Sequence, residues 1–140
     1  MRAVRALRLS EITWTQVDSL DAERLIAILP VGAVEAHGPH LPLSTDGTIS
    51  AAMAAAAAQR PAARGWQPLL LPAVDYSAAP FAAAFAGTIS IDPETMTRLV
   101  VEIGRGAPRC RCLAIANAHL DPTHLGSLHA AVDALEAERI

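Results

Sequence analysis

The chain is 140 residues long and carries 11 basic residues against 14 acidic ones, for a formal net charge of −3. All the basic residues are arginines scattered along the sequence, so the basic stripe typical of a nucleic-acid-binding protein is missing. No apolar run reaches the length of a membrane span. The length predicts one domain over residues 1–140, large enough to bury a core.

The N-terminus and the cysteines indicate a cytoplasmic protein. Arg5 and Arg8 interrupt any apolar segment that would act as a secretory signal. Cys110 and Cys112 are too close together to form a relaxed disulfide across an extended segment. Two free thiols favour a reducing compartment.

The first half of the chain predicts two strands and two helices. A short capped helix is expected within residues 7–20, and the unbroken apolar run at residues 25–32 predicts a strand buried on both faces. Residues 48–59 are rich in alanine, the best helix former, and predict a helix. A second strand is expected at residues 67–74. Residues 75–87 then form a long loop, and loops of that length in compact domains are often functional.

The second half predicts one more strand between two helices. Residues 92–94 read Asp-Pro-Glu, which is a strong helix start, and that helix is expected to end at Gly104 or Gly106. Residues 112–116 predict a third buried strand, and Asp-Pro at residues 121–122 begins a final helix. Strands that alternate with helices predict an α/β fold of three layers, with a mostly parallel sheet flanked by helices.

Side chains of the kinds that bind metal ions follow two of the predicted strands. These side chains are Glu35, His37, Asp46, His119 and Asp121. Because ligands bind beyond the carboxyl ends of parallel strands, we expect these side chains to meet at one edge of the sheet. The mixture of carboxylate oxygen and imidazole nitrogen suits zinc, manganese and iron.

The spacing of these residues is compatible with a pair of metal ions. Glu35 and His37 are two positions apart, as are His119 and Asp121, and such positions share one side of an extended segment. The carboxylate of Asp46 has two oxygens and can bridge two ions. Five ligands with one shared leave room for water on each ion, which is typical of a catalytic site.

Simpler interpretations stay open for several residues. Asp46 and Asp121 each stand at the start of a predicted helix, where they would serve as caps. His40 fits a structural role or a hydrogen bond to a metal ligand better than direct ligation. For His124 we expect a position in solvent or beside the ligands, since single histidines are weak indicators of a site.

The segment at residues 35–46 reads Glu-Ala-His-Gly-Pro-His-Leu-Pro-Leu-Ser-Thr-Asp. It closely resembles the signature of the creatininase family, the creatinine amidohydrolase-like hydrolases. The Gly-Thr-Ile-Ser at residues 87–90 and the Asn-Ala-His at residues 117–119 are similar to two further elements of that family. The resemblance runs from about residue 9 to the end of the chain.

This resemblance implies a function and a set of roles. It implies hydrolysis of a small non-peptide amide C–N bond, including the cyclic bond of a lactam, by a metal-activated hydroxide. It implies two divalent ions, zinc or manganese or both, and homo-oligomers that are commonly hexamers. Glu35 and His37 would bind different ions, and Asp46 would bridge them. His119 would join the ion of Glu35, and Asp121 would complete the site of His37.

Three departures from the family pattern matter. One is Asp121, which stands where the family often has a glutamate, so its carboxylate reaches one methylene less far. Residues 117–122 read Asn-Ala-His-Leu-Asp-Pro where Asn-Gly-His-Gly-Gly-Asn is common, so this loop is bulkier and stiffer. The chain also stops short of other family members, and no residue stands out as the acid that protonates the leaving nitrogen. We therefore expect a metal-dependent amidohydrolase. The alternatives are a shortened non-catalytic homologue, which binds metal or serves as an assembly subunit, and a plain α/β domain without metal.

Overall fold

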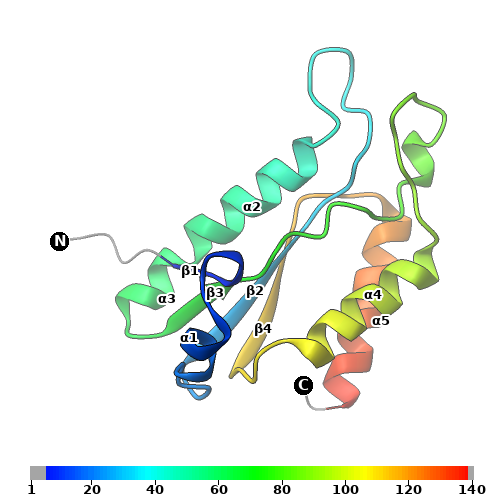
Figure 1. The fold of residues 1–140 in the computed structure, drawn as a ribbon. Helices are drawn as coiled ribbons and strands as arrows, with labels where there is room; N and C mark the ends of the chain where they lie inside the picture. The colour runs from blue at the N-terminus through cyan, green and yellow to red at the C-terminus, as the bar shows by residue number, and fades with distance from the viewer. Residues whose placement is uncertain (1–5, 139–140) are drawn as a thin grey trace.

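The computed structural model describes residues 6–138, and its centre is a four-stranded parallel sheet (Figure 1). In spatial order the strands are β1 (Leu7–Arg8), β3 (Gln67–Leu70), β2 (Leu25–Val31) and β4 (Cys112–Asn117). The helices are α1 (Trp14–Asp18), α2 (Thr45–Ala57), α3 (Gln59–Ala63), α4 (Pro93–Gly106) and α5 (Pro122–Ala137), with short 3₁₀ turns η1 (Leu9–Glu11) and η2 (Pro80–Ala82). Helices α2 and α3 cover one face and α4 and α5 the other, so the predicted three-layer α/β fold is confirmed (Figure 1).

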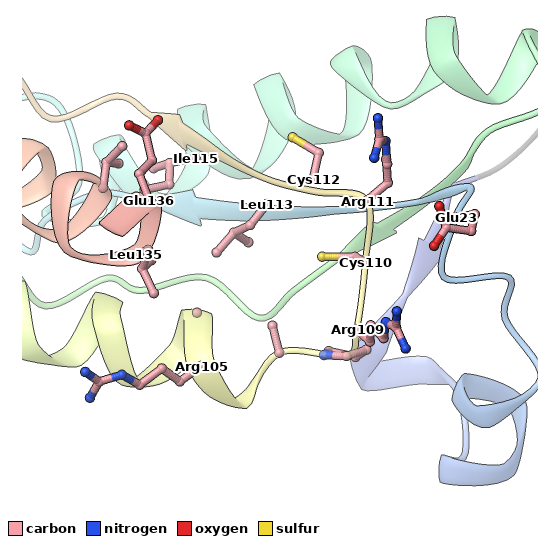
Figure 2. Close-up of a pocket in the computed structure, with 14 residues that line it drawn as sticks. Glu23, Arg105, Arg109, Cys110, Arg111, Cys112, Leu113, Ile115, Leu135 and Glu136 are labelled. Carbon is pink, nitrogen blue, oxygen red and sulfur yellow. The ribbon is translucent and has the colours of Figure 1, made fainter. Parts of the chain in front are cut away.

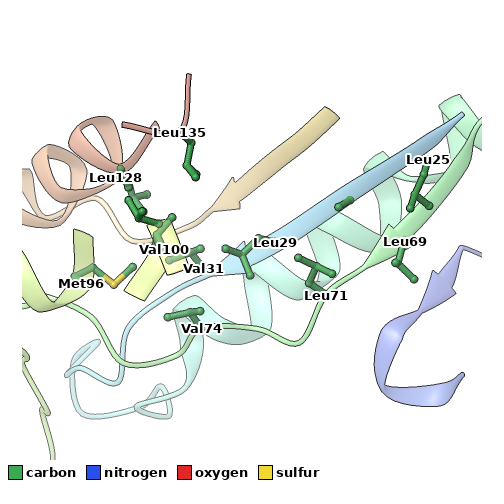
Figure 3. Packing of buried hydrophobic residues seen from close by; sticks show 13 residues of the cluster. Leu25, Leu29, Val31, Leu69, Leu71, Val74, Met96, Val100, Leu128 and Leu135 are labelled. Atoms are coloured by element: carbon green, nitrogen blue, oxygen red, sulfur yellow. The ribbon is translucent and has the colours of Figure 1, made fainter. Parts of the chain in front are cut away.

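The central strand β2 is buried on both faces. Its residues Leu25, Leu29 and Val31 belong to one core cluster with Met96 of α4 and Leu128 of α5. Val31 lies at the end of β2 near these helices, and Leu25 lies at the other end beside Leu69 of β3 (Figure 3). The alternate residue Ile28 packs with alanines of α2 on the opposite face. Because successive residues of a strand point to opposite faces, the unbroken apolar run is what a doubly covered strand requires.

The helix starts near the sheet are close to those predicted. The Asp92 carboxylate accepts hydrogen bonds from two backbone N–H groups of the first turn of α4, which confirms the predicted cap. Helix α2 begins at Thr45, earlier than the expected residue 48, so Asp46 lies inside its first turn rather than ahead of it. Cys110 and Cys112 are free thiols, as predicted. Within residues 6–138, no helix is both long and apolar enough to cross a membrane; Arg5 lies outside the described residues.

The predicted strand at residues 67–74 is shorter than expected. Regular pairing of β3 ends at Leu70, although the N–H groups of Leu71 and Val74 still donate to carbonyls of β2. Pro72 has no N–H group and interrupts the ladder between them. The chain therefore follows β2 to the edge of the sheet without forming a regular strand.

The end of β2 and the start of α2 approach each other closely at Gly32. A Cβ atom at this position would lie 2.5 Å from the backbone nitrogen of Gly47 and 2.7 Å from the backbone carbonyl carbon of Asp46. Only glycine leaves space for this backbone contact. The contact places the first turn of α2, and with it Asp46, against the carboxyl end of the sheet.

The Gly32→Ala substitution is expected to lower the free energy of unfolding by about 1–3 kcal/mol, because the added methyl group meets rigid backbone. Gly126→Ala is the matched control. Gly126 lies inside α5 with open space around it, so alanine there is expected to raise stability by about 0.5–1 kcal/mol. Urea unfolding of the two variants measures both changes. Equal effects would contradict the close approach at Gly32.

Candidate metal centre

The predicted site residues lie together at the carboxyl edge of the sheet. Glu35 and His37 follow β2, Asp46 is in the first turn of α2, and His119 follows β4. They line a pocket of about 410 Å³ together with Phe81, Ala118, Leu120, Asp121 and Pro122. Segments far apart in the sequence thus converge at the edge where parallel α/β sheets bind their ligands.

A larger pocket lies elsewhere, beside the start of β4 (Figure 2). It has a volume of about 710 Å³ and is lined by arginines, Cys110 and Cys112. Its Arg105 already donates hydrogen bonds to Glu102 and Glu138. None of the predicted ligands lines it, so the smaller pocket is the candidate site.

Backbone contacts hold the loop that carries Glu35 and His37. The Glu35 N–H group donates to the Leu43 carbonyl at 3.1 Å, and the Ala36 N–H group donates to the Thr88 hydroxyl, also at 3.1 Å. Gly38 has a φ of 79°, which glycine adopts at little cost, and it turns the chain directly after His37. The loop is therefore fixed on both sides of the first ligand pair.

The carboxylate of Asp46 lies between two imidazoles. Its Oδ1 is 2.9 Å from His37 Nε2, and its Oδ2 is 3.0 Å from His119 Nδ1. Glu35 Oε1 is 3.1 Å from the same His119 Nδ1 and 3.9 Å from His37 Nε2. Ligand atoms of Glu35, His37 and Asp46 all fall within 4.8 Å of one another. The side chains are thus close enough to share one or two cations.

The outward-facing nitrogens of both imidazoles contact backbone carbonyls. His37 Nδ1 is 3.1 Å from the Glu35 carbonyl oxygen, and His119 Nε2 is 3.0 Å from the Ala78 carbonyl oxygen. A carbonyl oxygen only accepts hydrogen bonds, so these nitrogens carry the proton. When the His119 ring is neutral, its Nδ1 then presents a lone pair toward Asp46, whereas His37 Nε2 lies within hydrogen-bond distance of Asp46 Oδ1. Such outer hydrogen bonds are what fixes the tautomer of metal-binding histidines.

Two buried atoms at the centre of the site lack a hydrogen-bond donor. Among the described residues, Asp46 Oδ2 and His119 Nδ1 are the buried side-chain atoms without a hydrogen-bond partner, although they lie 3.0 Å apart. Both residues are nearly inaccessible, at 3% and 2% exposure. Two facing acceptors are costly to bury. A cation between them satisfies both, so the donor set fits a metal ion.

The acid–base properties of the cluster agree with this interpretation. Burial raises the pKa of Glu35 above its ordinary value, against the opposing effect of His119 and His37. Burial lowers the pKa of His37, but the Glu35 carbonyl and the neighbouring carboxylates outweigh it, so the pKa is raised overall. Both shifts favour the protonated form. A cluster that attracts protons in this way also attracts divalent cations.

Asp121 lies at the rim of the same pocket, but its carboxylate has other contacts. Its Oδ1 accepts a hydrogen bond from the Thr123 N–H group at 2.7 Å, and its Oδ2 accepts one from the Phe81 N–H group at 3.3 Å. Burial raises the pKa of Asp121, but these hydrogen bonds lower it below its ordinary value. Asp121 therefore caps helix α5, as one of the two interpretations of the sequence expected. Each of its oxygens keeps a second lone pair that could bind a cation.

His40 and His124 lie in different environments. His40 is exposed in its loop. His124 is fully buried, with its ring centroid 4.7 Å from that of His119. Burial and the neighbouring His119 lower the pKa of His124 to about 4, although Asp121 acts in the opposite direction.

Two contributors to the site were missed from the sequence. Ser77, which contacts His124, lies in a loop of small residues that gives no signal of its own. The Ala78 contact is made by a backbone carbonyl, which every residue has, so the sequence gives no sign of it. Asn117 was noted only as part of the Asn-Ala-His element, whose spacing was the one available signal.

Comparisons with known proteins identify the family. The family model for creatininase (creatinine amidohydrolase) matches residues 10–139, and the chain belongs to this family. The resemblance inferred from the motif is therefore confirmed.

Three similar proteins show how much of each relative this chain covers. The mycofactocin precursor peptide peptidase of Mycobacterium tuberculosis (strain ATCC 25618 / H37Rv) is 42% identical over 119 residues, which cover 79% of this chain and 46% of the relative. A crystal structure of creatinine amidohydrolase (creatininase) matches with a TM-score of 0.77 and 26% identity, over 96% of this chain and 54% of that one. A structure described as "Creatininase Mn" matches with a TM-score of 0.71 and 27% identity, over 97% and 55%. The chain thus spans about half the length of these relatives.

Removal of metal is expected to destabilise the wild-type protein. At a free zinc concentration about 100 times the Kd, bound zinc adds about 2.7 kcal/mol of stability, which chelation with EDTA removes. Asp46→Asn is expected to abolish this difference, because the asparagine amide presents only one oxygen. His40→Ala, in the same motif but exposed, is expected to keep it. Thermal melts with zinc and with EDTA measure the shift. A wild-type protein that melts at the same temperature in both would contradict the metal centre.

Proposed function

We propose that the chain is a metal-dependent hydrolase that cleaves an amide C–N bond. One observation carries this proposal: the acceptors Asp46 Oδ2 and His119 Nδ1 are buried and face each other at 3.0 Å without a donor. A divalent cation at this position would satisfy both, and the resemblance to the creatininase family implies one. Zinc and manganese suit the mixed oxygen and nitrogen donors, and iron is a third candidate.

The distances support two ions that share Asp46. On one side, Asp46 Oδ2 and Glu35 Oε1 lie 3.0 and 3.1 Å from His119 Nδ1. On the other side, Asp46 Oδ1 lies 2.9 Å from His37 Nε2. Asp121, at the rim of the same pocket, is the proposed further ligand on the His37 side. Glu35, His37, Asp46, His119 and Asp121 are thus the proposed metal residues.

Bound ions of this kind supply a water molecule that is nucleophilic near neutral pH and polarise the carbonyl of the amide. The residues of the chain prepare the site for this chemistry. The carboxylates of Glu35 and Asp46 offset the positive charge of the ions. The carbonyls of Glu35 and Ala78 keep the proton on the outer nitrogen of each imidazole, so the inner nitrogens stay available.

The rim of the pocket favours an amide next to an apolar group. Phe81 and Leu120 line the pocket and are 92% and 74% exposed. Exposed apolar side chains beside a polar centre are typical of a ligand-binding mouth. A relative is described as acting on a precursor peptide and another as acting on creatinine, so the substrate class widens from small amides and lactams to peptides.

The assembly and location of the protein are also proposals. Strand β4 is an edge of the sheet within the described residues and is only half buried, and the larger pocket lies against it (Figures 1 and 2). We propose that this edge is covered in a homo-oligomer, with the hexamer of the family as the expected form. The free thiols of Cys110 and Cys112 fit the cytoplasm.

A second candidate function is that of a metal-binding subunit without catalysis. It is favoured by the lining of the candidate pocket, which consists of the proposed metal ligands and of apolar residues. The described residues that line the pocket include no side chain outside the proposed metal ligands that could protonate a leaving nitrogen.

Activity assays on purified protein with added zinc or manganese separate the two functions. We expect turnover of at least one member of a panel of creatinine, other cyclic amides and short peptides with apolar side chains. Asp46→Ala is expected to abolish turnover and His40→Ala to retain it. Stoichiometric metal without turnover of any substrate would support the subunit. Absence of bound metal in the wild-type protein would contradict both.

Asp121→Asn tests the second ion separately. Asparagine keeps the helix-cap hydrogen bond from the Thr123 N–H group through its single oxygen but loses the one from the Phe81 N–H group, so the melting temperature of the metal-free protein is expected to fall slightly. The amide is a poorer ligand, so bound metal is expected to fall from two ions to one per chain. Metal analysis by mass spectrometry measures the ratio. An unchanged ratio would show that Asp121 acts only as the cap of α5.

A further inference from the structure

Three polar side chains next to His119, two of them fully buried, are joined to one another and to the His119 backbone by hydrogen bonds. Asn117 clasps the backbone of His119: its Nδ2 donates to the His119 carbonyl at 2.7 Å, and its Oδ1 accepts from the His119 N–H group at 3.0 Å. The same Oδ1 lies 2.9 Å from His124 Nε2. The other ring nitrogen of His124 contacts the hydroxyl of Ser77.

These contacts fix the direction of each hydrogen bond. Because Asn117 Nδ2 donates to a carbonyl, Oδ1 is the acceptor, and His124 Nε2 must carry the proton. His124 Nδ1 is then an acceptor, and the Ser77 hydroxyl donates to it. Ser77 and His124 are both fully buried, and their polar side-chain atoms are all paired inside the protein.

The chain of contacts leads back to the outer ring nitrogen of His119. Ala78, the residue after Ser77, supplies the carbonyl that accepts from His119 Nε2 at 3.0 Å. The ring of His124 also packs against the ring of His119, with 4.7 Å between centroids and a tilt of 52°. The side chain of His119 is thus held through its outer nitrogen and its ring face, and its backbone through Asn117.

We propose that His124 is a positioning residue for His119, acting through Ser77 and Asn117. By holding the Ser77 hydroxyl it keeps the Ala78 carbonyl over His119 Nε2, which directs Nδ1 toward Asp46 and Glu35. His124 is not itself a ligand, because both its ring nitrogens are engaged. The inference rests on the proposed metal centre, and it assigns a task to residues outside that ligand set.

The test compares variants of the full chain by two readouts besides activity. Ser77→Ala removes one hydroxyl, His124→Leu removes both hydrogen bonds, and His124→Gln can restore them in part. His129→Leu is the matched control, since His129 lies on the same helix and is exposed. Zinc affinity is measured by competition with a chelator, and the geometry of the site by the visible spectrum of the cobalt(II)-loaded protein.

We expect Ser77→Ala and His124→Leu to weaken zinc binding by about 10- to 100-fold and to alter the cobalt spectrum. His124→Gln is expected to recover part of both, and His129→Leu to match the wild type. A lower melting temperature of the metal-free variants with unchanged zinc affinity and cobalt spectrum would overturn the proposal, because it shows a purely structural role.

Ser77→Ala keeps the test decisive if His124→Leu fails to fold, because it deletes a single buried oxygen. Failure of the proposed function has a different signature. A wild-type protein that binds no zinc at all overturns the metal centre itself, whereas tight zinc binding that none of these variants changes overturns only the role of His124.

Discussion

A buried carboxylate between two imidazoles is the constraint on which the site depends. Asp46 turns one oxygen toward His37 and the other toward His119, and both rings have their outer nitrogens bonded to backbone carbonyls. When the His119 ring is neutral, its Nδ1 turns a lone pair toward Asp46 Oδ2, and both atoms are buried without a hydrogen-bond partner. Two buried acceptors that face each other repel, and this arrangement is stable in a protein interior when a cation lies between them.

The fold supplies this arrangement through backbone contacts rather than through the ligands themselves. Glu35 and His37 follow the end of β2, and His119 follows the end of β4. The pairing of β2 with β4 places these two strand ends side by side (Figure 1). Gly32 lets the first turn of α2 approach the same edge closely enough for Asp46 to reach both. A metal site built on strand ends and a helix start is more rigid than one built on loops alone.

The sequence predicted the elements whose signals are local. The apolar run of β2 and the Asp-Pro start of α4 each carry their own pattern, and both lie where they were predicted. The candidate ligand residues could be named from the sequence because their types and spacing have chemical meaning, and the structure brings them together at one pocket. Strand β3 was predicted to be too long. The apolar residues continue past Leu70, but Pro72 has no N–H group and so removes a hydrogen bond from the strand pairing.

Contacts between distant parts of the chain could not be predicted in this way. The hydrogen bond next to His119 joins the hydroxyl of Ser77, a loop residue, to the ring of His124, a helix residue 47 positions later in the sequence. A single histidine within α5 looks the same in sequence whether it is buried or exposed, as the contrast between His124 and the exposed His129 shows. Such pairings become visible only when the fold brings the segments together.

Anomalous X-ray diffraction from crystals grown with zinc, recorded on both sides of the zinc absorption edge, tests the central claim most directly. The account predicts an anomalous peak between Asp46 Oδ2, Glu35 Oε1 and His119 Nδ1, with His119 Nε2 still bonded to the Ala78 carbonyl. A map without a peak at that position, with His119 Nδ1 hydrogen-bonded to a water molecule instead, would contradict it.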